Sequence, residues 1–100
     1  MAAFDLLGRR GALRILWELR GGKPMTFRVL QEAASTNPAV LNTRLAELRA
    51  AGLVVHEGQG YQLAPHGKTL LRALGPLSNW AAEWGAHLAA AAAPSKHGDA

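Results

Sequence analysis

The sequence contains no cysteine, which excludes disulfides, thiolate catalysis, zinc–thiolate sites and redox sensing through a thiol. Long hydrophobic runs are also missing, since no apolar stretch reaches the ~18 residues that a bilayer-spanning helix needs. The first residues, Met-Ala-Ala-Phe-Asp, show no basic segment followed by an apolar one, so no signal peptide is expected. These absences predict a soluble cytoplasmic protein that does not enter a membrane.

Patterns typical of enzymes and metal proteins are missing too. No serine lies in a nucleophile elbow, no glycine-rich loop links a strand to a helix, and no acidic pair suggests acid–base chemistry. Four histidines are present, at His56, His66, His87 and His97. They have neither metal-ligand spacing nor carboxylate or cysteine companions in register. We therefore expect no enzymatic activity, no bound metal and no cofactor.

The chain has 100 residues, of which 49% are hydrophobic, and a formal net charge of +4. This length suits a single domain, expected over residues 1–93, with a disordered tail over residues 94–100. A chain of this size buries proportionally less surface than a larger one, so dimerisation would help it to hide apolar surface. The positive charge fits a polyanionic partner but does not establish one.

The segment around which the rest of the chain is organised spans residues 37–53. Asn37 can cap a helix by accepting hydrogen bonds from the first-turn amides, and Pro38 suits the first helical position, where no amide partner is needed. Gly52 supplies the stop. Between these ends, three leucines recur at i, i+4 and i+7 and form one apolar stripe. They are Leu41, Leu45 and Leu48.

The opposite face of this helix differs from an ordinary solvated face, which would carry more Lys and Glu. It consists of Ala39, Asn42, Thr43 and Ala46, with Arg44 and Arg49 beside them. These side chains are small or able to form hydrogen bonds, so the face is slim enough to enter a groove and to read it. We interpret residues 38–51 as a DNA recognition helix.

Two shorter helical regions precede it. Residues 3–20 are expected to form a helix in two pieces, because the glycines inside it each cost ~1 kcal/mol relative to alanine. Trp17 falls at a spacing typical of the core. Thr26 can cap a further helix over residues 27–34, which a turn of about three residues joins to the recognition helix. Two helices joined in this way match a helix-turn-helix.

After Gly52 the pattern changes to strand. Residues 53–57 are rich in β-branched side chains, residues 58–60 have turn chemistry, and residues 61–63 form the returning strand. Directly after a recognition helix, such a hairpin is interpreted as a wing that lies against DNA.

The last helix begins at Pro65 and is expected to reach about residue 92, with a kink or break at Gly75-Pro76. Its apolar residues repeat with the spacing 4-3-4-3-4 of a helix that packs on another helix, at Leu70, Leu74, Leu77, Ala81, Trp84 and Leu88. Trp80 widens this stripe. The simplest use is a homodimer interface, and the alternative is that the helix folds back over its own core. The predicted interface residues are Leu70, Leu74, Leu77, Trp80, Trp84 and Leu88.

Trp80 and Trp84 also support a second hypothesis. They could line a cleft between the terminal helices of a dimer and the helix-turn-helix, where a small aromatic effector would bind and change the spacing of the two recognition helices. The alternative is that both tryptophans belong to the dimer core.

The predicted fold is thus mainly α with a small β-hairpin, a winged helix-turn-helix with a long C-terminal dimerisation helix. This order of elements resembles the HxlR-type winged-helix transcriptional regulators, relatives of the MarR group, over about residues 4–88. The stretches that carry the resemblance are Asp5-Leu6-Leu7-Gly8, Thr26-Phe27 through Leu30, Val40-Leu41-Asn42-Thr43-Arg44-Leu45, and Tyr61-Gln62-Leu63. Gly11 replaces the family's tryptophan, the wing is short and lacks Arg and Lys, and the family's N-terminal cysteine is absent. Any regulatory signal is therefore expected to be something other than thiol oxidation.

Candidate base contacts lie on the slim face. Asn42 can pair bidentately with adenine, while Ala39 and the methyl of Thr43 can touch the methyl group of thymine. Candidate backbone contacts from the wing are His56, Gln59 and Tyr61, of which Tyr61 could instead belong to the core.

Candidate phosphate contacts are Arg28 and Arg44, helped by the amides near Asn37 at the helix N-terminus. For Arg44 the alternative is an ion pair with Glu47 or Glu18, worth ~0–1 kcal/mol at a surface. A second basic patch, or simply a solvated face, is formed by Arg9, Arg10 and Arg14.

These features predict a homodimeric, sequence-specific regulator of transcription, a repressor rather than an activator, whose partner is double-stranded DNA. A competing hypothesis is a winged-helix module that binds a protein through the same slim face, supported by the weak wing and the modest charge. A third hypothesis is a small-molecule antidote or carrier protein, which only the tryptophans support.

Overall fold

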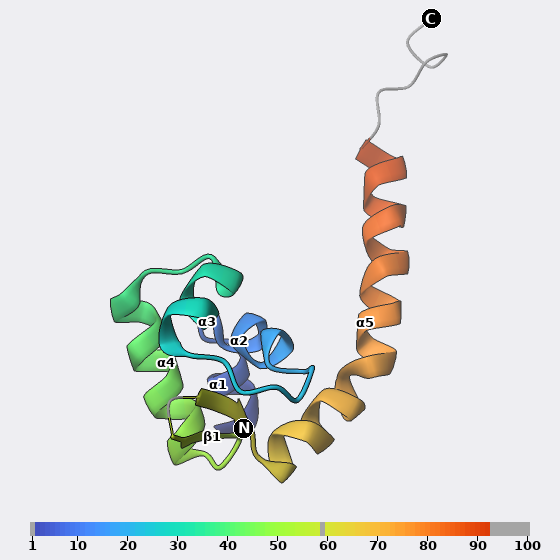
Figure 1. Cartoon of the computed structure of the whole chain (residues 1–100). Helices are drawn as coiled ribbons and strands as arrows, with labels where there is room; N and C mark the ends of the chain where they lie inside the picture. Colours follow the sequence, from blue (N-terminus) through green and yellow to red (C-terminus); the bar gives the residue numbers. More distant parts are fainter. Residues whose placement is uncertain (1, 59, 93–100) are drawn as a thin grey trace, which may run out of the picture.

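The computed structural model describes residues 2–58 and 60–92. Within these residues the elements follow one another as α1 (Ala2–Leu7), α2 (Ala12–Glu18), α3 (Phe27–Ala34), α4 (Pro38–Ala50), β1 (Val54–Glu57), β2 (Gly60–Leu63) and α5 (Pro65–Ala92) (Figure 1). This order confirms the predicted winged helix-turn-helix with a long terminal helix. The tail expected over residues 94–100 lies outside the described residues.

The core lies between α2, α3, α4 and the hairpin. Each helix contributes one apolar stripe, so that the three leucines of α4 meet those of α2 and α3 at its centre. The buried cluster consists of Ile15, Leu16, Leu19, Leu30, Leu41, Leu45, Leu48, Val54 and Leu63. Close packing of this kind fixes the position of α4 relative to α2 and α3.

Trp17 corrects the sequence interpretation, because its side chain is 48% exposed rather than part of the core. The helix α2 has only seven residues, and its buried side already holds Ile15, Leu16 and the following Leu19. Trp17 lies on the outer side of α2, where the guanidinium of Arg20 sits 4.0 Å from the centre of its ring. A cation over an aromatic face is a favourable arrangement at a surface.

The hairpin is short and antiparallel, with Val54 opposite Leu63 and Glu57 opposite Gly60. A third segment joins its edge, since Met25 and Tyr61 exchange two backbone hydrogen bonds of 2.9 and 2.7 Å. The segment between α2 and α3 thereby covers the outer edge of β2 and satisfies backbone groups that an edge strand would otherwise expose.

The start of α5 fits closely against the turn between α4 and β1 at one glycine. A Cβ atom on Gly67 would come within 2.2 Å of the carbonyl oxygen of Leu53, so only glycine lets the helix approach at this distance. That same oxygen accepts a hydrogen bond of 2.9 Å from the amide of Ala64. The direction in which α5 leaves the domain is set here.

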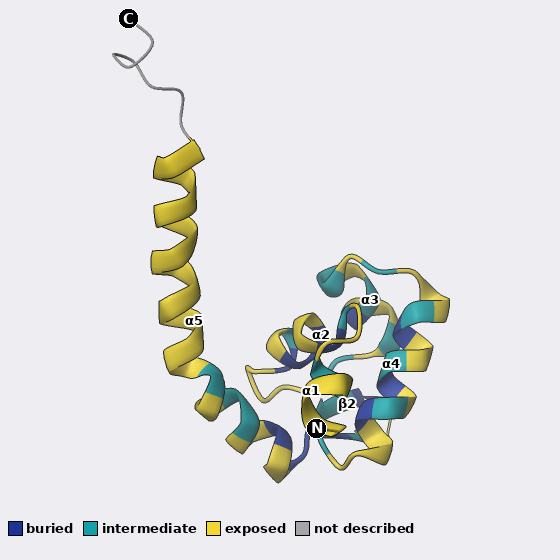
Figure 2. Cartoon of the chain, turned by 180° about the vertical axis from the view of Figure 1, so that it is seen from behind, coloured by how far each residue is buried: buried dark blue, intermediate teal, exposed yellow. Residues whose placement is uncertain are grey.

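Beyond its first turns, α5 leaves the domain altogether. The helix bends part-way along its length and then projects away from the other elements (Figure 1), with Pro76 inside it as the predicted cause. Leu74 is its last half-buried residue, and every later position up to Ala92 is exposed (Figure 2). The alternative in which this helix folds back over its own core is therefore wrong. The Cα radius of gyration, 17.0 Å, exceeds the ~13 Å of a compact 100-residue domain for the same reason.

Candidate nucleic-acid interface

Side-chain caps hold the two helices of the helix-turn-helix in place. The hydroxyl of Thr26 accepts a hydrogen bond from the amide of Val29 at 3.2 Å, and the side-chain oxygen of Asn37 accepts one from the amide of Val40 at 2.8 Å. Between the helices, Ser35 adopts a left-handed conformation with φ of 52°, which turns the chain sharply. Both caps predicted from the sequence are confirmed.

The slim face of α4 points to solvent. Leu41, Leu45 and Leu48 on the inner side are at most 2% exposed, which anchors the helix from behind. Exposed positions alternate with these buried ones along α4 (Figure 2). The exposed residues of the slim face are Ala39, Asn42, Thr43 and Ala46. No described part of the chain covers this face, so a groove of another molecule can receive it.

Thr43 has a fixed orientation on this face. Its hydroxyl donates a hydrogen bond of 3.0 Å to the carbonyl oxygen of Ala39, one turn earlier. Because the hydroxyl hydrogen is used inside the helix, Thr43 offers a partner its methyl group and its oxygen lone pairs. The methyl group is the part needed for contact with a thymine methyl.

Arg44 is held inside the domain rather than presented to solvent. Its side chain is only 19% exposed, and its Nε donates to the carbonyl oxygen of Arg10 at 2.9 Å. Its Nη1 donates to Glu47 at 2.6 Å, which is the ion pair weighed as the alternative to a phosphate contact. In the free protein Arg44 thus forms the alternative ion pair, because α4 turns this side chain toward the connection between α1 and α2. Its phosphate contact stays a prediction.

Glu47 is shared by two arginines, since Arg9 also forms an ion pair with it. The hydrogen bond from Arg44, together with the charges of Arg44 and Arg9, lowers the pKa of the Glu47 carboxyl from its ordinary value of 4.5 despite some opposing desolvation. The carboxylate is therefore the species that ties α4 to the connection between α1 and α2.

The remaining arginines near the helix-turn-helix differ in how tightly they are held. The side chain of Arg28 is 89% exposed, and its Nε lies 3.8 Å from the nearest carboxylate oxygen of Glu32, which is a loose ion pair. The Arg28 side chain therefore remains largely mobile. Arg14 instead pairs with Glu18 at 2.7 Å and donates to the backbone of α3. With Arg9 and Arg14 both paired, the second basic patch is largely neutralised.

Two arginines emerge as candidates that the sequence interpretation did not select. Arg10 lines a recess of about 230 Å³ that also contains Ser35, Thr36 and Asn37 at the N-terminus of α4. Only the fold brings Arg10 there. Arg49 is exposed and lies seven positions after Asn42, on the same side of α4. Its helical spacing already places Arg49 beside the slim face in the sequence, although it was not among the predicted phosphate contacts.

The wing has a limited surface for DNA. His56 is exposed and stacks on Tyr61, with ring centres 4.0 Å apart, and Tyr61 itself is half-buried against the core. Tyr61 thus lies between the two predicted environments, with one part packed on the core and the other on the surface of the wing. Near the tip, Glu57 accepts a hydrogen bond from Gln62, and Gln59 lies outside the described residues. The described wing residues carry one negative charge and no Lys or Arg.

The apolar stripe of α5 divides into a packed and a free part. Leu70 and Leu74 are half-buried, while the rest of the stripe is between 44% and 54% exposed at Leu77, Trp80, Trp84 and Leu88. Trp80 and Trp84 stack on each other with ring centres 5.3 Å apart.

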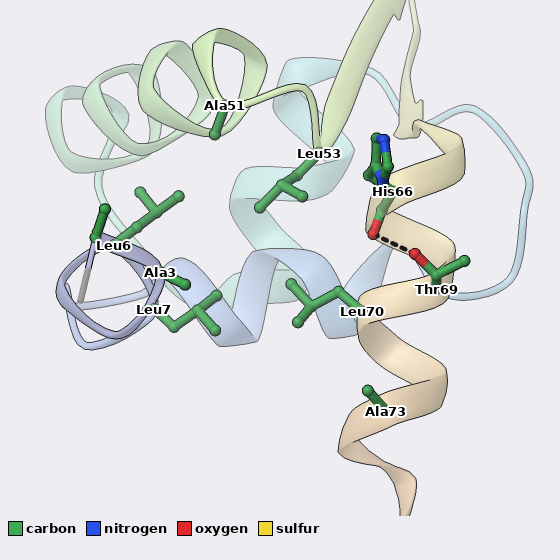
Figure 3. Close-up of a pocket in the computed structure, with 10 residues that line it drawn as sticks. Ala3, Leu6, Leu7, Ala51, Leu53, His66, Thr69, Leu70 and Ala73 are labelled. Atoms are coloured by element: carbon green, nitrogen blue, oxygen red, sulfur yellow. Dashed lines mark hydrogen bonds between the residues drawn. The ribbon is translucent and has the colours of Figure 1, made fainter.

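The cleft expected beside these two tryptophans requires the terminal helices of two copies, so it stays a prediction. Within the single chain, an apolar cleft of about 520 Å³ lies between α1, the turn that follows α4 and the start of α5. Leu7, Leu53 and Leu70 face one another across it, with His66 and Thr69 at one side (Figure 3). Trp80 and Trp84 do not line it because the bend in α5 carries them away from the helix-turn-helix.

Among residues 2–58 and 60–92, no group of three or more His, Asp or Glu side chains could hold a metal ion. No helix in the described part of the chain is long and apolar enough to cross a membrane.

Residues 6–89 match the family described as HxlR-like helix-turn-helix. The chain belongs to this family. It is 30% identical over 89 residues to the HTH-type transcriptional regulator YvaP of Bacillus subtilis, covering 82% of each chain. Among solved structures, quinone-bound YodB of B. subtilis is similar at 27% identity and a TM-score of 0.74, over 82% of this chain and 92% of that one.

The MarR family protein Rv2887 of Mycobacterium tuberculosis is similar at 25% identity and a TM-score of 0.66, over 82% of this chain and 63% of that one. These findings confirm the predicted resemblance. The HxlR-like protein is a helix-turn-helix transcriptional regulator and not an enzyme.

Proposed function

We propose that this HxlR-like regulator is a cytoplasmic homodimer that binds specific DNA sequences and represses transcription by placing α4 in the major groove. The observation that carries the proposal is the exposed slim face of α4, at Ala39, Asn42 and Thr43, in front of three fully packed leucines. An α-helix fits the major groove, where each base pair presents a distinct pattern of donors and acceptors.

Phosphate contacts would hold α4 in register on the duplex. The first-turn amides of α4 and the nearby Arg10 form one anchoring point, because helix N-termini favour anions. Arg28 on α3 and Arg49 at the end of α4, both exposed, supply two more. Arg44 contributes chiefly by fixing α4 to the domain, while the weakly charged wing, including His56, contributes backbone contacts at most.

The exposed stripe of α5 supports the homodimer. A run of half-exposed leucines and tryptophans along a projecting helix is unusual on a monomer and typical of an association surface. Pairing α5 with a second copy would bury this stripe and set two α4 helices side by side. The two half-sites are then expected about 34 Å apart, one turn of DNA.

A small aromatic effector completes the proposal. YodB, to which this chain is similar, has been solved with a quinone bound, and the present chain offers apolar space next to α5. A ligand at α5 would change the spacing of the two recognition helices and thereby the affinity for DNA.

A footprint on genomic DNA tests the proposal directly. We expect a protected, two-fold symmetric site whose halves are one helical turn apart, and mobility shifts that weaken as salt rises. Asn42→Ala should change the base preference at one position per half-site, with a loss of about 1–3 kcal/mol for the preferred base. Thr43→Val keeps the methyl group and should therefore leave the preference for thymine at its own position unchanged.

The opposite result would favour the competing hypothesis. If no fragment forms a specific, salt-sensitive complex, the slim face serves a protein partner and the DNA proposal fails. If a complex forms but Asn42→Ala leaves its base preference unchanged, Asn42 does not read bases.

A further inference from the structure

An open groove separates the wing from α4. It has a volume of about 560 Å³, with Ala46, Arg49 and Ala50 on its α4 side and His56 and Glu57 on its wing side. Of the residues that line it, Arg49 is the only Lys or Arg and Glu57 the only Asp or Glu. Their formal charges cancel, so this groove lacks the positive charge expected of a surface that meets DNA.

The wing is tied to the body of the domain close to Glu57. Glu57 lies opposite Gly60 in the register of the hairpin, and a Cβ atom on Gly60 would come within 2.4 Å of the Cβ atom of Pro24. The next residue, Tyr61, exchanges two backbone hydrogen bonds with Met25. These contacts fix the place of the Glu57 backbone on the wing.

The slim face of α4 and this groove share a residue. Ala46 belongs to both, so insertion of the slim face brings the groove to the edge of the DNA major groove. The major groove is about 12 Å wide and a helix with its side chains is about 10–12 Å across, so phosphate backbone borders both flanks of an inserted helix. Arg49 then faces one backbone from α4, and Glu57 faces the same backbone from the wing.

We infer that Glu57 weakens DNA binding, because it holds a negative charge beside the phosphate backbone that borders the major groove. Glu57 is exposed, and its carboxylate accepts a hydrogen bond of 3.3 Å from Gln62, a neutral amide that leaves the charge in place. Phosphate contacts carry no sequence information, so weaker backbone binding leaves a larger share of the affinity to base contacts of the slim face. This inference rests on the proposed function, since it requires α4 to enter the major groove.

The size of the effect follows from Coulomb's law. Two like charges about 6 Å apart in water repel with an energy that corresponds to a roughly threefold loss of affinity. A homodimer on two half-sites carries two such carboxylates, so the loss should be roughly tenfold for the complete site. Salt screens the repulsion, and the loss should therefore be smaller at high ionic strength.

Glu57→Gln tests the inference, because it removes the charge and keeps the shape and an acceptor for Gln62. Mobility shifts of the full chain should show roughly three- to tenfold tighter binding at about 50 mM salt, to the footprinted site and to an unrelated duplex alike. The gain should shrink at about 200 mM salt. A misfolded variant would lose affinity, so it cannot imitate this result.

Two further variants separate position from net charge. Glu83 is an exposed carboxylate on the projecting part of α5, so Glu83→Gln changes the net charge equally and should leave DNA affinity within about twofold. Glu57→Lys reverses the charge on the wing. It should tighten binding further and steepen the slope of log affinity against log salt by about 0.9 for each new phosphate contact.

Three results would overturn the inference. If neither Glu57→Gln nor Glu57→Lys changes the affinity, the wing lies away from the backbone. If Glu57→Gln weakens binding, the carboxylate makes a favourable contact, such as accepting from a cytosine amino group. If Glu83→Gln tightens binding as much as Glu57→Gln, only net charge matters. Failure of the proposed function would be seen separately, as the absence of a footprint for the wild type and for both Glu57 variants.

Discussion

Glu47 joins the recognition helix to the rest of the domain through Arg44 and Arg9. Because these arginines lower its pKa from 4.5, the folded state binds its proton less readily than the unfolded state does. The ion pairs therefore stabilise the protein above the unfolded pKa, and this contribution is lost as pH falls through the folded pKa.

Glu47→Gln should accordingly lower the free energy of unfolding at pH 7, measured with urea. The difference from wild type should shrink as the pH is taken below 4.5, because both proteins then carry an uncharged side chain at this position. A difference that stays constant with pH would show that the charge of Glu47 is not what matters.

The two arginines first selected as phosphate contacts should now behave differently. Arg28→Ala removes an exposed cation, so the slope of log affinity against log salt should become shallower by about 0.9. Arg44→Ala removes a cation that is already paired with Glu47, so it should leave the slope nearly unchanged and lower stability instead. Mobility shifts at a series of salt concentrations give both slopes, and equal changes would mean that Arg44 leaves Glu47 when DNA binds.

At the scale of elements, the junction of α4, the hairpin and α5 depends on one close approach. Gly67→Ala would put a Cβ atom 2.2 Å from the Leu53 carbonyl oxygen and should cost about 1–3 kcal/mol of unfolding free energy through overpacking. Thermal and urea unfolding measure this loss.

Gly75 is the matched control on the same helix, since a Cβ atom there meets nothing within 4 Å. Gly75→Ala should be neutral or stabilising by up to about 1 kcal/mol, because alanine favours helix. Equal losses at both positions would mean that the contact with Leu53 does not limit how α5 packs.

At the scale of the whole molecule, the projecting part of α5 should decide whether two chains associate. Trp84→Ala should raise the Kd of the dimer roughly 30-fold, since tryptophans at the centre of an interface contribute about 2 kcal/mol or more. Analytical ultracentrifugation measures this change. Trp17→Ala, at an exposed tryptophan outside the stripe, is the control and should leave association unchanged. A wild-type chain that stays monomeric at micromolar concentration would contradict the homodimer.

Much of this fold is contained in local signals. Asn37, Pro38 and Gly52 set the limits of α4, and Thr26 begins α3, because capping depends on residues within one helical turn. The leucine spacing of α4 likewise predicts its buried side, since helical period alone determines which residues share a face. The family resemblance rests on these same stretches and is confirmed over residues 6–89.

The sequence by itself determined the elements, their order and the slim exposed face of α4, because each follows from spacing along the chain. Only the tertiary structure decided that Arg44 is taken by Glu47 and Arg10, and that Trp17 lies outside the core. These outcomes depend on which residues far apart in the chain become neighbours, and helical period carries no information about that.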